Sequence, residues 1–309
     1  MKKIVFAFML LPLVINSQNF SGEITYQLKI IPKSDTIDLK NIIETKHGNI
    51  STYVITAKRY KSTYLKDGKY SYSYTYDDNT KRMYDDLLDK PYITYRDSRK
   101  ANYQYYDAKI QKDSTTYVLG HESYMVLTKS DYGTMKTFYT DDFKVNPEDF
   151  EGHKIGDWYN KLKMVNGAIS LKTITEFDSH YEVQEAIKID EREVKPEEFL
   201  LPNKPVAASY SALDIPVSVE EPNKTQIDCY QDKVMKASIQ GGKKFTSYIS
   251  FLLEKDGSIK FIEPINKDKD ELYKITIDIV EKCKFSFVPG QIEGKPVDSK
   301  VIFPVEFYR

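Results

Sequence analysis

Histidine and cysteine, two residue types that often carry acid–base, nucleophilic or metal chemistry, are few in this chain of 309 residues, and they lie far apart in the sequence. The histidines are His47, His121, His153 and His180. Only His121 stands beside an acidic residue, Glu122, and neighbouring residues of a strand point to opposite faces of a sheet. The sequence has no cysteine pair at the spacing of a zinc site and no G-x-S-x-G motif of a serine hydrolase. We therefore expect no catalytic residues, no metal and no cofactor, and we predict that the protein is not an enzyme.

Tyrosine is the residue type that stands out, with 25 copies in the chain. Tyr70, Tyr72, Tyr74 and Tyr76 alternate with small hydroxyl residues, so a strand here would place four rings on one sheet face. One interpretation is cross-strand packing, which stabilises a sheet by about 0.2–1 kcal/mol per pair. The other is a ligand face, on which a glycan stacks or an acyl chain lies. The pattern favours packing. For Trp158, we likewise favour a position in the core or in a lid over a ligand contact.

The two cysteines, Cys229 and Cys283, are 54 positions apart. A disulfide between them would stabilise the fold by about 4 kcal/mol in the chain-entropy model, because it closes a long loop. An exported protein meets the oxidising conditions that such a bond needs. The alternative is a pair of buried thiols packed as small apolar groups. Both alternatives remain open at the level of sequence.

Residues 1–18 have the pattern of a signal peptide. Lys2 and Lys3 precede an apolar run over Ile4–Ile15, and we expect cleavage before Gln18. Twelve apolar residues are fewer than the roughly 20 that span a bilayer, so we expect export to the periplasm with no membrane-spanning segment in the mature protein. The net charge is −1 with no basic stripe, so we expect no binding to nucleic acid.

The elements that must position any site divide the chain into three parts after the signal peptide. Residues 19–203 contain many short alternating segments separated by turns such as Asp67-Gly68, which is typical of a largely antiparallel, half-barrel-like sheet. Residues 204–223 carry Pro205, Pro216 and Pro222 with little periodicity, as in a linker. We expect residues 224–309 to form a small second domain.

Four segments of residues 224–309 have clear patterns. A hairpin is predicted over 245–265 through Asp256-Gly257, and the apolar spacing after Leu272 predicts an amphipathic helix. The last strand carries four alternating apolar residues, Val301, Phe303, Val305 and Phe307. Because Pro304 has no N–H, this last strand should lie at an edge of its sheet.

The segments F-S-F-V-P-G (285–290), G-K-P-V (294–297) and V-I-F-P-V-E-F (301–307) follow one another in an order that resembles the C-terminal domain of TonB. That resemblance implies a small domain with an antiparallel sheet and two helices, which binds by lending a sheet edge. With the β-rich N-terminal domain, it makes the expected fold class α+β. It implies a protein or peptide partner, such as an outer-membrane transporter. The implied partner-binding residues are Lys300, Val301, Ile302, Phe303, Pro304, Val305, Glu306 and Phe307.

The N-terminal region carries three shorter motifs, S-G-E-I-T-Y (21–26), L-G-H (119–121) and E-F-L-L-P (198–202). They resemble exported domains of the GLPGLI and LolA-like kind. That resemblance implies a curved sheet whose concave apolar face can hold lipid or acyl chains.

Two functions follow from these observations. The first is a non-catalytic periplasmic protein that recognises a protein or peptide by strand addition at residues 300–307. The alternative is a lipid or lipoprotein carrier that uses the concave face of the N-terminal domain.

Overall fold

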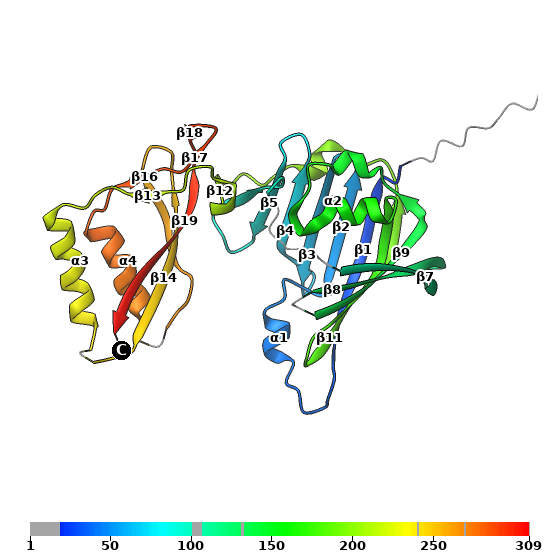
Figure 1. The fold of residues 1–309 in the computed structure, drawn as a ribbon, viewed down its shortest axis with the longest axis horizontal. Coiled ribbons are helices and arrows are strands. Elements are labelled where there is room, and N and C mark those ends of the chain that lie inside the picture. The colour runs from blue at the N-terminus through cyan, green and yellow to red at the C-terminus, as the bar shows by residue number, and fades with distance from the viewer. Residues whose placement is uncertain (1–18, 101–106, 131–132, 240, 269, 309) are drawn as a thin grey trace, which may run out of the picture.

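The structure, a computed structural model, describes residues 19–100, 107–130, 133–239, 241–268 and 270–308 (Figure 1). The predicted signal peptide and its cleavage site before Gln18 lie outside these residues. The described chain forms two lobes side by side, an N-terminal lobe built mainly of strands and a C-terminal lobe with two long helices.

The N-terminal lobe is an antiparallel sheet in the order β6-β5-β4-β3-β2-β1-β11-β10-β9-β8-β7. The strands are β1 Gly22–Pro32, β2 Ile50–Thr56, β3 Arg59–Lys66, β4 Lys69–Asp77, β5 Arg82–Leu87, β6 Ile93–Asp97, β7 Asp107–Val118, β8 His121–Ser130, β9 Gly133–Lys144, β10 Ala168–Glu176 and β11 His180–Glu191. Asp67 and Gly68 join β3 to β4 with φ of 52° and 74°, the left-handed pair that a two-residue hairpin turn requires. The sheet curves so strongly that β7 and β8 run across the direction of β1 and β2 (Figure 1).

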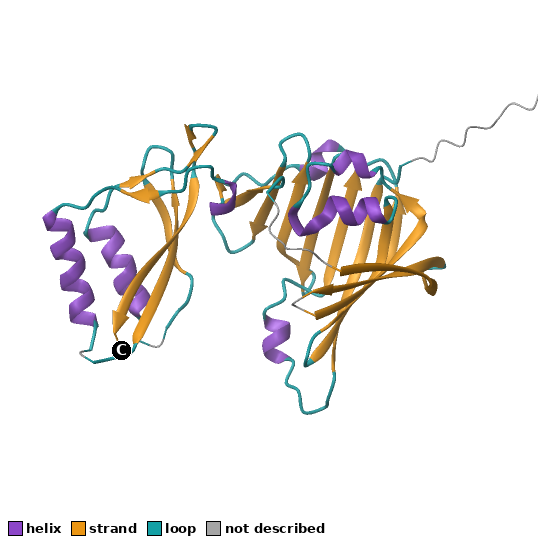
Figure 2. Ribbon diagram, viewed as in Figure 1, coloured by secondary structure: helices purple, strands orange, loops and turns teal. Residues whose placement is uncertain are grey.

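Short helices accompany this sheet, with α2 in front of the strands and α1 at their lower end in the view of Figure 2. They are α1 Lys40–Glu44, η1 Pro147–Phe150, η2 Ile155–Asp157 and α2 Trp158–Met164. Beneath α2, Leu162 and Phe150 pack into the main apolar cluster of the lobe together with Ile24 and Ile55. Gly167, after α2, has φ +76°, and an added Cβ would lie 1.9 Å from the carbonyl oxygen of Val145, so only glycine fits this return to the sheet.

The C-terminal lobe packs α3 Lys224–Ala237 and α4 Leu272–Lys282 against β14 Lys244–Leu253, β15 Ile259–Pro264 and β19 Ser299–Tyr308. Asn223 caps α3 in a reciprocal pair of hydrogen bonds with Gln226. Cys229 and Cys283 form a disulfide, with their Cα atoms 5.6 Å apart, that ties α3 to the end of α4. The smaller elements are η3 Pro196–Phe199, β12 Val206–Ala208, η4 Tyr210–Ala212, β13 Ser218–Val219, β16 Phe287–Val288, β17 Gln291–Ile292 and β18 Lys295–Pro296.

The expected α+β fold class, with a half-barrel-like domain and a separate TonB-like domain, is wrong. The main sheet is continuous over 15 strands and runs from β15 through β14, β19 and β12 into β6 and on to β7. The chain is therefore mostly β, and its C-terminal strands β14, β15 and β19 belong to the main sheet, whereas β13 with β16 and β17 with β18 form two small sheets. The two lobes share one sheet because of β12. Its three residues pair in parallel with β6, and Ala208 also pairs in parallel with Ser299 of β19. A strand of three residues among prolines has no periodicity from which to predict it. The predicted domain boundaries stay predictions.

Strand β19 pairs with β14 along its whole length but with β12 only at Ser299. The backbone N–H and carbonyl of Tyr308 point away from β14. The N–H donates to Ser238 Oγ, and the carbonyl accepts from the Ile239 N–H. Backbone direction alternates along a strand, so the nitrogen of Pro304 also points away from β14. The missing N–H therefore costs the β14–β19 ladder no hydrogen bond.

Candidate functional site

The concave face of the N-terminal lobe holds an apolar hollow of about 60 Å³ beneath α2. The side chains around it come from β1, β2, β9, β10 and α2. They are Tyr26, Tyr53, Ile55, Tyr139, Trp158, Lys161, Leu162, Ala168, Ile169 and Ser170. The hollow thus combines aliphatic and aromatic side chains with a few polar groups, the usual composition of a small-molecule site.

Local geometry explains why these side chains meet. Strand alternation places Ser51, Tyr53 and Ile55 on the concave face of β2. Before α2, Gly156 and Asp157 have φ of 64° and 55°, and this left-handed pair turns the chain so that α2 begins at Trp158. Trp158 and Leu162 are four positions apart, so they lie on the same side of the helix and pack onto the sheet.

Two hydrogen-bond donors at this hollow, the Tyr53 hydroxyl and the Trp158 Nε1–H, are buried and have no partner within the described parts of the chain. The Tyr53 side chain is only 9% exposed. Its neighbour Tyr26 is satisfied, because the Tyr26 hydroxyl donates to the Ser170 carbonyl at 2.7 Å. Leaving one such buried group unpaired costs about 1–3 kcal/mol. A group that accepts hydrogen bonds would therefore be stabilised here.

The hollow also has a positive end. Lys161 lines it, and burial lowers the pKa of this lysine, an effect that the nearby Asp157 carboxylate opposes. No carboxylate is among the residues that line the hollow. Burial likewise raises the pKa of Tyr53 well above its ordinary value, so its hydroxyl keeps the proton that it can donate.

A second, wider hollow of about 340 Å³ lies beside α1 on the same concave face. It includes Leu28 of β1 and Ser51 of β2, each two residues from a residue of the first hollow, Tyr26 and Tyr53. Two residues of a strand span about 6.5–7 Å. A more apolar space of about 270 Å³ adjoins it, lined by Leu28, Ile30, Ile43, Lys46, Gly48, Asn49, Lys66 and Asp67. The hollows therefore follow one another along β1 and β2.

The tyrosines of β4 do not all share one face, which corrects the prediction. Tyr72 pairs with Tyr64, but the next residue of β3, Leu65, pairs with Tyr70, so a bulge puts Tyr70 on the opposite face. There the Tyr70 hydroxyl donates to the Asp86 carbonyl. On the concave face Tyr72, Tyr74 and Tyr76 pack against rings of β3, and Tyr72 also lines the second hollow.

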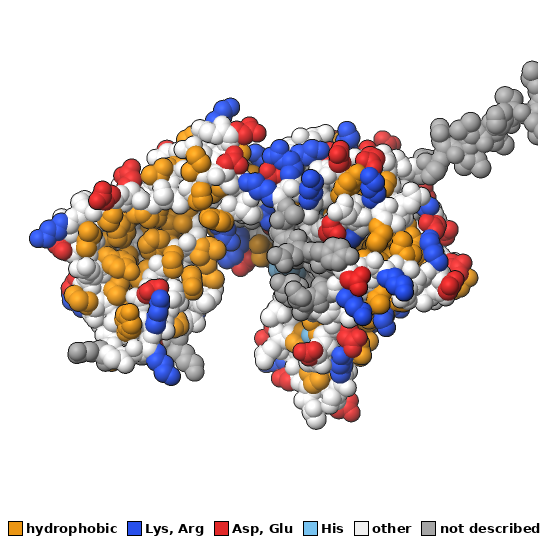
Figure 3. Space-filling view, viewed as in Figure 1, with side chains coloured by type: hydrophobic (Ala, Val, Ile, Leu, Met, Phe, Trp, Pro, Cys, Tyr) orange, Lys and Arg blue, Asp and Glu red, His pale blue; other side chains and the backbone are white. Residues whose placement is uncertain are grey.

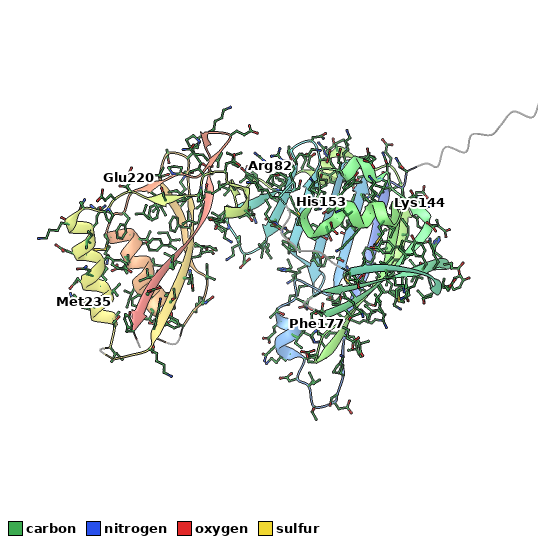
Figure 4. All side chains as sticks on the ribbon, in the orientation of Figure 1. Arg82, Lys144, His153, Phe177, Glu220 and Met235 are labelled. Carbon is green, nitrogen blue, oxygen red and sulfur yellow. A yellow bond between two sulfur atoms is a disulfide. The ribbon has the colours of Figure 1, made fainter. Side chains whose placement is uncertain are left out.

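The histidines stay apart in the fold. His121 is 2.6 Å from Asp142, His180 lies near Glu182, and the ring of His47 packs on Tyr72 at the second hollow. His153 belongs to the segment that leads into α2 (Figure 4), and its side chain is buried with Nε2 2.5 Å from the Tyr60 hydroxyl. Over the described ranges, no three His, Cys, Asp or Glu residues are grouped as metal ligands. The absence of an enzymatic activity stays a prediction.

The proposed partner-binding residues lie on β19, where Val301, Val305 and Phe307 are buried against the helices and Ile302 is 56% exposed. A third hollow, of about 570 Å³, adjoins this strand where the lobes meet. Its lining residues are Arg96, Ser209, Tyr210, Ser211, Leu213, Val217, Lys300, Val301 and Ile302.

Charges of both signs are spread over the viewed face of the N-terminal lobe, whereas hydrophobic side chains gather on that of the C-terminal lobe (Figure 3). Of the helices that the structure describes, none is long and apolar enough to cross a membrane.

No protein-family model and no curated protein matches this chain. Solved structures similar to it include two crystal structures of PNGF-II, each 12% identical with a TM-score of 0.39. The matched regions cover 75% and 94% of this chain and 43% and 61% of the PNGF-II chains. This chain therefore spans less than two thirds of the length of PNGF-II. The lipoprotein LppX of Mycobacterium tuberculosis and a LolA-superfamily protein of Nitrosomonas europaea are each 8% identical with a TM-score of 0.28. These two cover 57% and 60% of this chain and 89% and 91% of their own chains.

A LolA-superfamily protein is thus among the similar structures. Nothing in the comparisons supports the resemblance to TonB or the outer-membrane transporter that it implied as a partner. TM-scores of this size say nothing about function. The functional proposal below rests on the geometry of the hollows.

Proposed function

We propose that the protein is a non-catalytic carrier in the periplasm that holds an amphiphilic molecule, a lipid or a lipid-modified peptide, on the concave face of its N-terminal lobe. The observation that carries this proposal is the row of hollows along β1 and β2. It begins beneath α2, where aliphatic and aromatic side chains line the hollow, and continues past Leu28 to the apolar space beside Ile30 and Ile43.

An amphiphile suits this row because apolar and polar surfaces alternate along it. Burying methylene groups against Ile55 and Leu162, or against Leu28 and Ile30, removes about 25 cal/mol of unfavourable hydration per Å². Between these apolar parts Ser51 and Gln184 line the second hollow, and the Gln184 amide donates to Ser51 Oγ. Such groups can satisfy an ester or amide of the ligand. The short helices α1 and α2 lie at the two ends of the row and can cover a bound chain.

The proposal predicts that filling the second hollow will weaken lipid binding. Leu28→Trp adds bulk inside the hollow, whereas Lys29→Trp adds the same side chain to an exposed position on the opposite face of β1. We expect displacement of a fluorescent fatty-acid probe to show binding weakened by roughly tenfold or more in Leu28→Trp, the cost of about 1.4 kcal/mol of lost contact. Lys29→Trp should bind as the unchanged protein does.

Mass spectrometry of protein isolated from the periplasm supplies the independent measurement. Co-purified lipid should be present and should be lost in Leu28→Trp. Equal probe binding by both tryptophan variants, or no binding of any amphiphile by the unchanged protein, would exclude the carrier function.

A second function, recognition of an extended peptide by strand addition, is favoured by the outer edge of β19. Beyond Ser299 this edge pairs with no strand among the residues described, so alternate backbone groups of 300–306 are available to a partner. Pro304 removes one donor from that edge. We expect peptide titrations followed by NMR to shift the amides of Lys300–Phe307 most, with weak affinity. Shifts confined to the concave face would rule out strand addition at β19.

A further inference from the structure

We infer that the hollow beneath α2 receives the carboxylate end of a long-chain acid, held by the Tyr53 hydroxyl, the Trp158 Nε1–H and the charge of Lys161. This inference rests on the proposed carrier function and names the chemical class of the ligand and the direction in which it enters.

The polar groups around the hollow call for an acceptor that carries negative charge. Tyr53 and Trp158 each bring a buried donor with no partner among the described residues. Lys161 adds a positive charge, which the nearby Asp157 carboxylate partly offsets. A hydrogen bond to a charged acceptor is about twice as strong as one between neutral groups. A carboxylate has two oxygens and can accept from both donors at once.

The size of the hollow limits the head group. One water needs about 10–15 Å³ of such space. The hollow of about 60 Å³ therefore has room for a group of a few heavy atoms. A carboxylate fits that space, whereas a sugar or a glycerophosphate head group does not. The bulky part of the ligand must therefore lie outside the hollow.

The direction of the ligand follows from the order of the hollows. With its carboxylate between Tyr53 and Trp158, a hydrocarbon chain that follows β1 and β2 along the concave face reaches the spaces lined by Leu28, Ile30 and Ile43. The acid would thus enter head first, with its polar end beneath α2 and its chain toward α1.

The experiment compares three ligands with one chain length, a fatty acid, its methyl ester and the corresponding alcohol, on the full protein stripped of lipid. We expect the acid to bind about tenfold or more tightly than the ester, and Tyr53→Phe to reduce that preference by roughly tenfold, as loss of a hydrogen bond to a charged group would. Lys161→Met should remove the preference for the acid. The matched control is Tyr92→Phe, which alters another buried tyrosine outside the hollow and should leave binding unchanged.

A second measurement separates binding from folding. The Tyr53 hydroxyl has no partner among the residues that the structure describes, so Tyr53→Phe should keep or raise the melting temperature of the ligand-free protein while it weakens acid binding. A lower melting temperature together with unchanged preference for the acid would mean that the hydroxyl serves the fold alone, and would overturn the inference.

The outcomes also separate the inference from the function on which it rests. If none of the three ligands binds, the carrier function itself fails. If all three bind equally in the unchanged protein and in Tyr53→Phe, the carrier function stands and the carboxylate site does not. In that case the two donors are satisfied by water.

Discussion

Replacing Cys229 and Cys283 together by alanine should lower the free energy of unfolding of the C-terminal lobe by about 4 kcal/mol, because the disulfide closes a loop of 54 residues. Helix α3 should be affected first. Among its described residues only Ala237 is buried. Besides the disulfide, the partly buried Tyr230 and Val234 and the ion pair of Lys233 with Asp278 hold α3 to the rest of the lobe. Hydrogen exchange of the α3 amides should become fast in the variant.

The test includes its own control, since Trp158 is the one tryptophan of the chain and lies in the N-terminal lobe. Its fluorescence should report a transition that the double substitution leaves nearly unchanged, while urea unfolding of the C-terminal lobe shifts. A non-reducing digest should show one cross-linked peptide pair. Complete alkylation of both cysteines without reductant, in exported protein, would contradict the disulfide.

Acidification should destabilise the N-terminal lobe through His153. Burial, assisted by the charge of Arg96, lowers the pKa of this histidine from 6.5 to about 3. The folded state therefore holds His153 neutral while the unfolded chain binds a proton below pH 6.5, so stability falls as the pH decreases from 6.5 toward 3. Between pH 7 and pH 4.5 the expected loss is about 2.5 kcal/mol.

Thermal or urea unfolding at a series of pH values measures this effect. His153→Gln keeps a hydrogen-bonding side chain near Tyr60 but does not titrate, so its stability should change less over this pH range. His121→Gln, which changes a histidine paired with Asp142 at the surface, should keep the full dependence on His153. Identical pH profiles for His153→Gln and the unchanged protein would show that other groups dominate the acid response.

Local patterns in the sequence predicted those elements that local chemistry determines. Asp67-Gly68 marks a hairpin turn because both residues tolerate positive φ, and they form that turn. The bulge at Tyr70 could not be predicted in this way, since perfect alternation from Tyr70 to Tyr76 gives no sign of an extra residue. Strand β12 was missed for a similar reason, because it is defined by its partners β6 and β19 and not by its own three residues.

The residues of the candidate site could not be predicted from the sequence, which indicated only a concave face and a core or lid position for Trp158. Tyr53 is one tyrosine among 25, and nothing in its neighbours along the chain distinguishes it. Its importance arises because its hydroxyl lacks a partner, whereas that of Tyr26 has one in Ser170. Whether a donor is satisfied depends on residues far away in sequence, so only the folded structure identifies it.

Strand β12 also decides what would happen to the two lobes if they were separated. Its backbone pairs with β6 and with β19, and Ala207 packs with Tyr92 and Leu252 from the two lobes. A cut on either side of β12 would leave one lobe with an open strand beside newly exposed apolar surface. Open strands of that kind recruit other chains and promote aggregation. Each lobe released alone should therefore be less soluble than the whole chain.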